Sequence, residues 1–133
     1  MITHLADTGW LIRSLRKNTA YTATLRKIGT PQLAVSLVSV AELLEGVYLA
    51  NDPAAARQAL ALELAGMTRL GLNEAIADLY GQHRSQLRRT NQLIGQTDLL
   101  IAVTTLYHNL TVLTTNAGEF QRVPGLSVIS TPF

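Results

Sequence analysis

The sequence predicts an α/β layer fold in which a mainly parallel sheet of four or five short strands is flanked by helices. The main observation is that short apolar stretches alternate with longer segments of helical periodicity along the chain. No linker or repeat interrupts this alternation. A length of 133 residues with 47% hydrophobic content also suits a single domain covering residues 1–133.

Five short and largely apolar stretches are the candidate strands. Residues that favour turns, such as Gly, Pro and Asn, stand at or near several of their ends. The first stretch runs into Asp7-Thr8-Gly9, which we interpret as a turn at the carboxyl end of a buried strand. The candidate strands are residues 2–6, 33–37, 67–72, 110–113 and 126–129.

The segments between these strands show the apolar periodicity of helices. In the first of them Trp10, Leu11 and Leu15 alternate with basic residues. The last begins near Asp98 and is then apolar all round, so it is expected to be buried centrally. The predicted helices cover residues 10–17, 19–28, 40–50, 54–65 and 74–87, with a final helix that includes residues 98–103.

Polar cap residues indicate where several of these helices begin. Ser39 and Glu42 are three residues apart, as in a capping box, which predicts that Glu42 lies in the first turn of its helix. Asp52 followed by Pro53 is a natural cap and first helical residue. The other predicted caps are Thr19, Asn73 and Thr97.

Three carboxylates stand at the ends of predicted elements. Asp7 follows the first strand, whereas Glu42 and Asp98 open helices, so all three can face the crevice at the carboxyl ends of the strands. Any one of them alone could be an ordinary helix cap. Together they would repel one another unless a cation were bound, and carboxylate oxygens are ligands that Mg²⁺ and Mn²⁺ prefer. The chain has no cysteine, which excludes a thiolate metal site.

Four motifs carry a resemblance to a known family. They are Leu-Ala-Asp-Thr at residues 5–8, Val-Ser-Val-Ala-Glu-Leu at 38–43, Ile-Gly-Gln-Thr-Asp-Leu-Leu-Ile-Ala at 94–102 and Leu-Thr-Thr-Asn-Ala-Gly-Glu-Phe at 113–120. Together they resemble the PIN-domain signature. The run Phe-Gln-Arg-Val-Pro-Gly-Leu at residues 120–126 is also similar to the phrase that ends many VapC-type toxins.

This resemblance implies a three-layer PIN-like fold and a metal-dependent endoribonuclease with Mg²⁺ or Mn²⁺ as cofactor. It implies that Asp7, Glu42 and Asp98 are the acidic, metal-binding core and that Glu119 completes it. The cation would hold an oxygen of the scissile phosphate, activate a water molecule and stabilise the departing 3′-oxygen. The expected supporting residues, which orient carboxylates or water molecules, are Thr8 and Asn116.

The resemblance also implies partners. They are an RNA substrate, a VapB-type antitoxin whose tail inserts a basic residue among the acids, and a second copy of the chain, in a homodimer or in a heterotetramer or octamer with the antitoxin. Arg84 and Arg88, one helical turn apart, are expected to contact RNA phosphates or an antitoxin carboxylate, although a solvated helix face is the simpler interpretation. Gly9 departs from the family pattern, in which Asn or Ser commonly follows Asp-Thr.

Two other functions fit parts of the sequence. One is a catalytically silent PIN-like domain that binds RNA or protein, which three intact core acids oppose. The other is a phosphoacceptor receiver domain, which would need a lysine after a late strand, whereas the lysines here are Lys17 and Lys27. The N-terminus lacks the pattern of a signal peptide, and no apolar run is long enough to span a membrane, so a cytoplasmic protein is expected.

Overall fold

The fold is built on one five-stranded sheet, which a computed structural model of all 133 residues places at the centre of the chain. The strands are β1 (His4–Ala6), β2 (Leu33–Ser36), β3 (Thr68–Leu70), β4 (Thr111–Leu113) and β5 (Ser127–Ile129). Their order is β3-β2-β1-β4-β5, and every neighbouring pair is parallel. The predicted α/β fold with a short-stranded parallel sheet is therefore confirmed.

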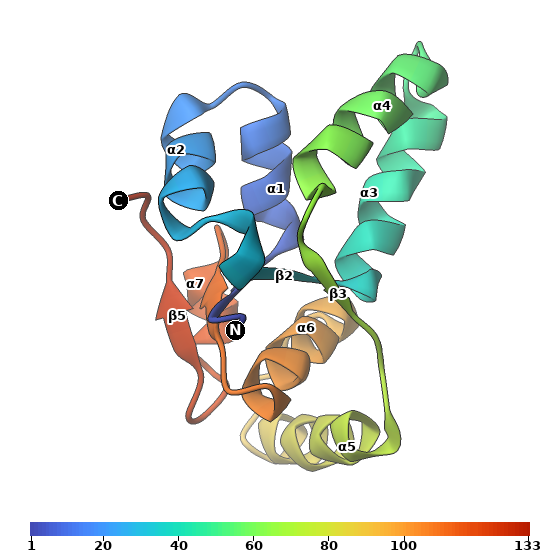
Figure 1. The fold of residues 1–133 in the computed structure, drawn as a ribbon. Helices are drawn as coiled ribbons and strands as arrows, with labels where there is room; N and C mark the ends of the chain where they lie inside the picture. Colours follow the sequence, from blue (N-terminus) through green and yellow to red (C-terminus); the bar gives the residue numbers. More distant parts are fainter.

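Seven helices and one 3₁₀ turn connect the strands (Figure 1). They are α1 (Thr8–Leu15), α2 (Thr19–Ile28), η1 (Thr30–Gln32), α3 (Leu37–Leu49), α4 (Pro53–Leu64), α5 (Glu74–Arg89), α6 (Gln96–Tyr107) and α7 (Ala117–Phe120). The sequence patterns did not predict η1 or α7, because neither is long enough to show a helical period. No helix combines the length and the apolar character that a bilayer crossing requires.

Two hydrophobic cores lie on opposite faces of the sheet and make the fold three-layered. Leu5 of β1 belongs to the core shared with α5 and α6, whereas its neighbour Ala6 belongs to the core shared with α1, α3 and α4. Successive residues of a strand point to opposite faces, so a strand buried on both sides reads as a continuous apolar run. Figure 1 shows α1–α4 gathered on one side of the sheet and α5 and α6 on the other.

The capping box predicted at Ser39 and Glu42 is wrong. Helix α3 starts at Leu37, and Ser36 is its cap, with Oγ accepting a hydrogen bond of 3.1 Å from the Val38 amide. Glu42 is therefore the sixth residue of the helix and lies in its second turn. Ser39 is fully buried inside the helix, where its hydroxyl has another partner.

Two other predicted caps are displaced by one or two residues. Thr19 and Thr97 both lie inside helices, whose caps are Asn18 and Gly95. Asp98 nevertheless lies in the first turn of α6, as predicted. The caps predicted at Asp52 and Asn73 are confirmed, since each side chain accepts a hydrogen bond from a first-turn amide.

The sheet topology argues against a receiver domain. Receiver domains have the strand order 2-1-3-4-5, in which the third strand neighbours the first. Here β3 is an edge strand beside β2, and β1 lies between β2 and β4. Both lysines, Lys17 and Lys27, lie in the region of α1 and α2 rather than after a late strand.

Candidate active site

The centre of the candidate site is Asp7, which follows β1 directly at the carboxyl edge of the sheet. Its backbone amide donates to the Leu113 carbonyl of the adjacent strand β4, at 2.9 Å. This pairing brings Thr114, the residue after β4, beside Asp7. Ligands of parallel sheets bind at this edge, so the fold places the first predicted acid where a site is expected.

The Asp7 carboxylate is buried and anchored on both of its oxygens. Oδ1 accepts a 2.7 Å hydrogen bond from the Thr8 amide and thereby caps α1, while Oδ2 accepts a 2.8 Å bond from Thr114 Oγ1. Burial raises the pKa of Asp7 because the charged form loses water, and the charge of Glu42 adds to this effect. The two hydrogen bonds oppose the rise, since they stabilise the charged form.

Thr8 links Asp7 to Glu42. Its hydroxyl donates to Glu42 Oε1 at 2.7 Å and lies 2.9 Å from the hydroxyl of the buried Ser39. Glu42 itself is exposed. The hydroxyl of Thr8 thus contacts one of the predicted acids, and its other neighbour is Ser39, which the sequence interpretation had taken for a cap.

Asn116 joins the other two predicted acids. Its Nδ2 donates to Asp98 Oδ2 at 3.1 Å and to Glu119 Oε2 at 2.8 Å. The amide of Asn116 donates to Thr114 Oγ1 at 2.9 Å, and that hydroxyl in turn donates to Asp7. A continuous set of hydrogen bonds therefore runs from Asp7 to Asp98 and Glu119 through Thr114, which the sequence interpretation had not singled out.

Asp98 and Glu119 behave as one titrating pair. Burial of Asp98, its hydrogen bond to Glu119 and the negative charges of Asp7 and Glu119 together raise the pKa of Asp98 to about 7. The same hydrogen bond lowers the pKa of Glu119. The pair therefore takes up and releases a proton near neutral pH, and Asp98 is the member whose pKa is raised.

These acids fit a divalent cation by their chemistry. Burial and the nearby negative charges of Asp7 and Glu119 raise the pKa of Asp98, and a bound cation would relieve the repulsion among these charges. No group of three or more acidic or histidine side chains is close enough to hold a metal ion, so the structure does not bring the predicted Asp7, Glu42 and Asp98 together as one ligand set. Mg²⁺ usually keeps several of its water molecules and can be bound through only one or two carboxylates. Asp98 with Asp7 is the pair that would hold it.

Gly9 lies in the first turn of α1, directly against Thr115. A Cβ atom at Gly9 would come within 2.2 Å of Thr115 Oγ1, well inside any permitted contact. The space that a side chain at position 9 would need is thus taken by the threonine hydroxyl. Thr115 stands between Thr114 and Asn116, both of which hydrogen-bond to the acids.

The arginines expected to flank the site differ in their surroundings. Arg84, on α5, is half-buried, and its Nη1 lies 3.5 Å from the Ile94 carbonyl oxygen, four residues before Asp98. Arg88 is exposed in the last turn of α5. Of these two arginines, Arg84 is the one that contacts the segment leading into α6.

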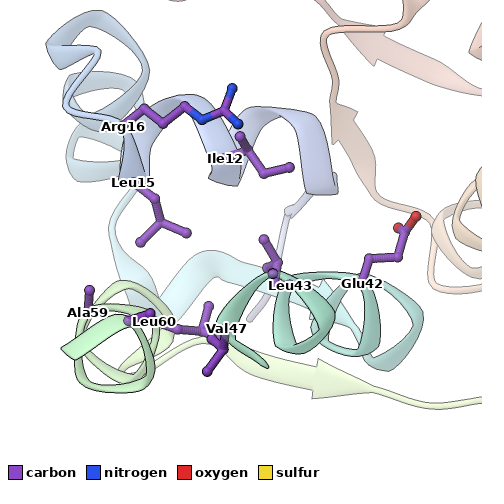
Figure 2. Close-up of a pocket in the computed structure, with 10 residues that line it drawn as sticks. Ile12, Leu15, Arg16, Glu42, Leu43, Val47, Ala59 and Leu60 are labelled. Carbon is purple, nitrogen blue, oxygen red and sulfur yellow. The ribbon is translucent and has the colours of Figure 1, made fainter. Parts of the chain in front are cut away.

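An apolar groove of about 300 Å³ lies between α1, α3 and α4 and ends at Glu42 (Figure 2). Its walls include Leu15 of α1, Leu43 of α3 and Leu60 of α4. In Figure 2 Glu42 lies at the end of the groove away from Leu60, and Arg16 directly follows α1. The other acids do not line this groove, so it adjoins the catalytic candidates rather than containing them.

The chain is similar to proteins of known family. A family model described as PIN domain matches residues 5–126. Ribonuclease VapC2 of Rickettsia felis is 31% identical over 94 residues, which cover 71% of this chain and 70% of that protein.

Two solved structures are similar over almost the whole chain. The crystal structure of VapBC2 from Rickettsia felis bound to a promoter DNA fragment contains a chain with a TM-score of 0.89 and 25% identity, covering 96% of this chain and 98% of that one. VapBC-5 from Mycobacterium tuberculosis, of the VapBC family of toxin-antitoxin systems, gives a TM-score of 0.72 and 25% identity, covering 97% of both chains.

Proposed function

The chain belongs to the PIN domain family, in its VapC branch, and on this basis we propose that it is a metal-dependent endoribonuclease and the toxin of a type II toxin–antitoxin pair. The observation that carries the proposal is the hydrogen-bonded set that links Asp7 to Asp98 and Glu119 through Thr114 and Asn116. Such a network holds several acids at one sheet edge although their charges repel.

Each residue of the set has a distinct task. Thr114 fixes Asp7, and Asn116 aligns Asp98 with Glu119 without adding charge. Asp7 and Asp98 are the residues that would hold Mg²⁺ or Mn²⁺. When bound, the metal would supply positive charge for the scissile phosphate and acidify the attacking water.

The two glutamates are placed to handle the water and its proton. Glu42 is exposed, and its carboxylate is held by Thr8 on the side of the crevice nearest the apolar groove. Glu119 is half-buried and shares the Asn116 amide with Asp98. Either carboxylate would orient a water molecule at the edge of the site. We propose that one of them accepts the proton of the attacking water.

The partner we propose is a VapB-type antitoxin, since the similar structures are VapBC assemblies. Its tail would place a basic residue among the acids, and its apolar side chains would fill the groove that ends at Glu42. Tyr48, Leu49 and Leu62 are large apolar residues exposed on α3 and α4. These side chains suit a further protein contact, and we propose that they pack against a second copy of the chain in a homodimer.

Cleavage of total cellular RNA by the purified, antitoxin-free protein tests the proposal, with Mg²⁺ or Mn²⁺ compared against EDTA. Asp7→Asn is the informative variant, because asparagine preserves the cap of α1 but removes the charge. Asp52→Asn makes the same change at the cap of α4, away from the other acids, and is the matched control. We expect discrete fragments that require metal, persist in Asp52→Asn and disappear in Asp7→Asn.

Intact RNA from folded wild-type protein in the presence of metal would contradict this function. It would favour the silent binding domain, in which the acids have only a structural task. Fragments that persist in EDTA would contradict the metal requirement while leaving a nuclease in place. Circular dichroism of each variant establishes that the fold is retained.

A further inference from the structure

Two arginines from different parts of the chain contact successive main-chain carbonyls of the loop that leads into α6. Arg122, which follows α7, donates from Nη1 to the Leu93 carbonyl at 3.1 Å. Arg84 of α5 approaches the next carbonyl, that of Ile94, at 3.5 Å. Helix α6 begins at Gln96, two residues after Ile94, so both guanidinium groups contact the segment just before the turn that holds Asp98.

Both guanidinium groups keep most of their hydrogen-bonding capacity free. A guanidinium has five N–H donors, and the bond to a carbonyl uses one of them. The bonded groups are main-chain carbonyls, which carry no net charge, so these two bonds leave the positive charge of each arginine in place. The carbonyl bonds also hold each side chain in place, which lowers the entropy that a ligand must overcome.

Arg122 also lies near one of the acids. Arg122 is three residues from Glu119, to whose carbonyl its amide donates at 3.0 Å, and its charge helps to lower the pKa of the Glu119 carboxyl. Arg88 and Arg89 extend the positive charge along the last turn of α5, the helix packed against α6 (Figure 1). The net charge of the chain is only +2, so this local grouping outweighs the overall charge in attracting a polyanion.

We propose that Arg84 and Arg122 form a phosphate-binding subsite that holds the RNA backbone beside the scissile phosphate. This inference rests on the proposed ribonuclease function and extends it to the placement of the substrate. An acidic site repels the phosphates that flank the bond to be cut, and fixed cations next to it offset that repulsion. Guanidinium groups suit the task because their forked donors match two phosphate oxygens.

RNA binding without cleavage tests the subsite independently of catalysis. The measurement is the affinity of Asp98→Asn protein for bulk transfer RNA in EDTA, followed over a range of salt concentrations. Arg122→Gln and Arg84→Gln are made in this background, because glutamine can still donate to the loop carbonyl but has no charge. Lys27→Gln, which removes one positive charge from the exposed surface of α2, is the matched control.

Each arginine variant is expected to weaken binding and to reduce the slope of log affinity against log salt by about 0.7 to 0.9, the value for one lost phosphate contact. Lys27→Gln should leave the slope unchanged. Arg122→Lys should keep most of the slope, because the charge remains. The melting temperature of every variant is measured alongside, since a purely structural clamp would lower it without changing the slope.

An unchanged slope of log affinity against log salt in both arginine variants overturns the proposed subsite. The two side chains would then only hold the loop, or bind carboxylates of a protein partner. That result would leave the ribonuclease proposal standing if the wild-type protein still cleaves RNA. Failure of the wild-type protein to bind or cleave RNA would instead contradict the proposed function itself. The two proposals can therefore fail separately.

Discussion

Thr114 Oγ1 donates a 2.8 Å hydrogen bond to Asp7 Oδ2, joining two residues that are 107 positions apart in the sequence. Both residues are buried, and the bond connects the ends of the adjacent strands β1 and β4. It also opposes the rise in pKa that burial imposes on Asp7. Thr114 therefore favours the charged form of a buried carboxylate at the edge of the sheet.

Thr114→Val is expected to destabilise the protein by about 1 to 3 kcal/mol at pH 7.5, since it leaves a buried charged oxygen without its donor. The folded-state pKa of Asp7 is already above its unfolded value, so its charge destabilises the fold increasingly as pH rises through that folded pKa. The variant raises the pKa further, and its deficit should shrink below about pH 4, where Asp7 is protonated in both states. Urea unfolding at pH 7.5 and at a pH below about 4 measures this difference, with Thr114→Ser, which keeps the hydroxyl, as the control. An equal loss of unfolding free energy at both pH values would contradict the prediction.

Gly9 and Thr115 should behave as a coupled pair. Gly9→Ala places a methyl group where Thr115 Oγ1 now lies, and overpacking of this kind typically costs about 1 to 3 kcal/mol. Thr115→Ala removes that oxygen, so the double variant should recover the loss. Thr115→Val keeps an atom near the same position and should therefore restore less of the lost stability than Thr115→Ala does. Strictly additive effects in the double-mutant cycle would show that the two side chains do not compete for this space.

Binding of the proposed metal should release a proton near neutral pH. Asp98 has a pKa of about 7 in the free protein and must lose its proton to become a ligand. Affinity for Mn²⁺ should therefore rise about tenfold per pH unit below pH 7 and level off above it. Calorimetric titration in buffers of different ionisation enthalpy measures the released proton. A pH-independent affinity between pH 5.5 and 8 would mean that Asp98 does not bind the metal.

Glu63 of α4 gives a second pH-dependent prediction, away from the site. Its Oε1 accepts from Ser14 at 3.1 Å, whereas its Oε2 is buried without a partner, and burial raises its pKa above the unfolded value. The charged form therefore weakens the fold as pH rises from about 4.5 through the folded pKa. Glu63→Gln should raise the melting temperature relative to wild type more at pH 7.5 than at pH 4. A difference that does not depend on pH would contradict this.

The sequence predicted the layers of this fold because its strands are buried on both faces and therefore appear as apolar runs. It also predicted that Asp98 opens a central apolar helix, since that pattern is local. The prediction for Ser39 was wrong because Ser36 and Ser39 both have the local pattern of a cap, and only packing shows which of them is buried.

Contacts between distant segments were beyond the reach of sequence patterns. Thr114 reads locally as an ordinary residue after a strand, and its role depends on the pairing of β1 with β4. The clash between Gly9 and Thr115 likewise depends on how α1 approaches the segment after β4. The positions of the acids at the ends of predicted elements and the family resemblance predicted the acids, whereas the hydroxyl and amide groups that contact them became visible only in the fold.

The proposed function requires that Asp98 binds the divalent cation on which RNA cleavage depends. The most direct test of this claim is the initial rate of RNA cleavage, measured against Mg²⁺ concentration for wild type, Asp98→Asn and Asp78→Asn. Asp78 is exposed on α5 and bonded to Gln82, so its variant controls for the loss of one carboxylate elsewhere. We predict saturable cleavage by wild type and Asp78→Asn, and a loss of at least about a hundredfold in Asp98→Asn, because removing even a group that only supports a metal ligand commonly costs ten- to a hundredfold. Equal rates for all three proteins, or cleavage that does not respond to Mg²⁺, would contradict the claim.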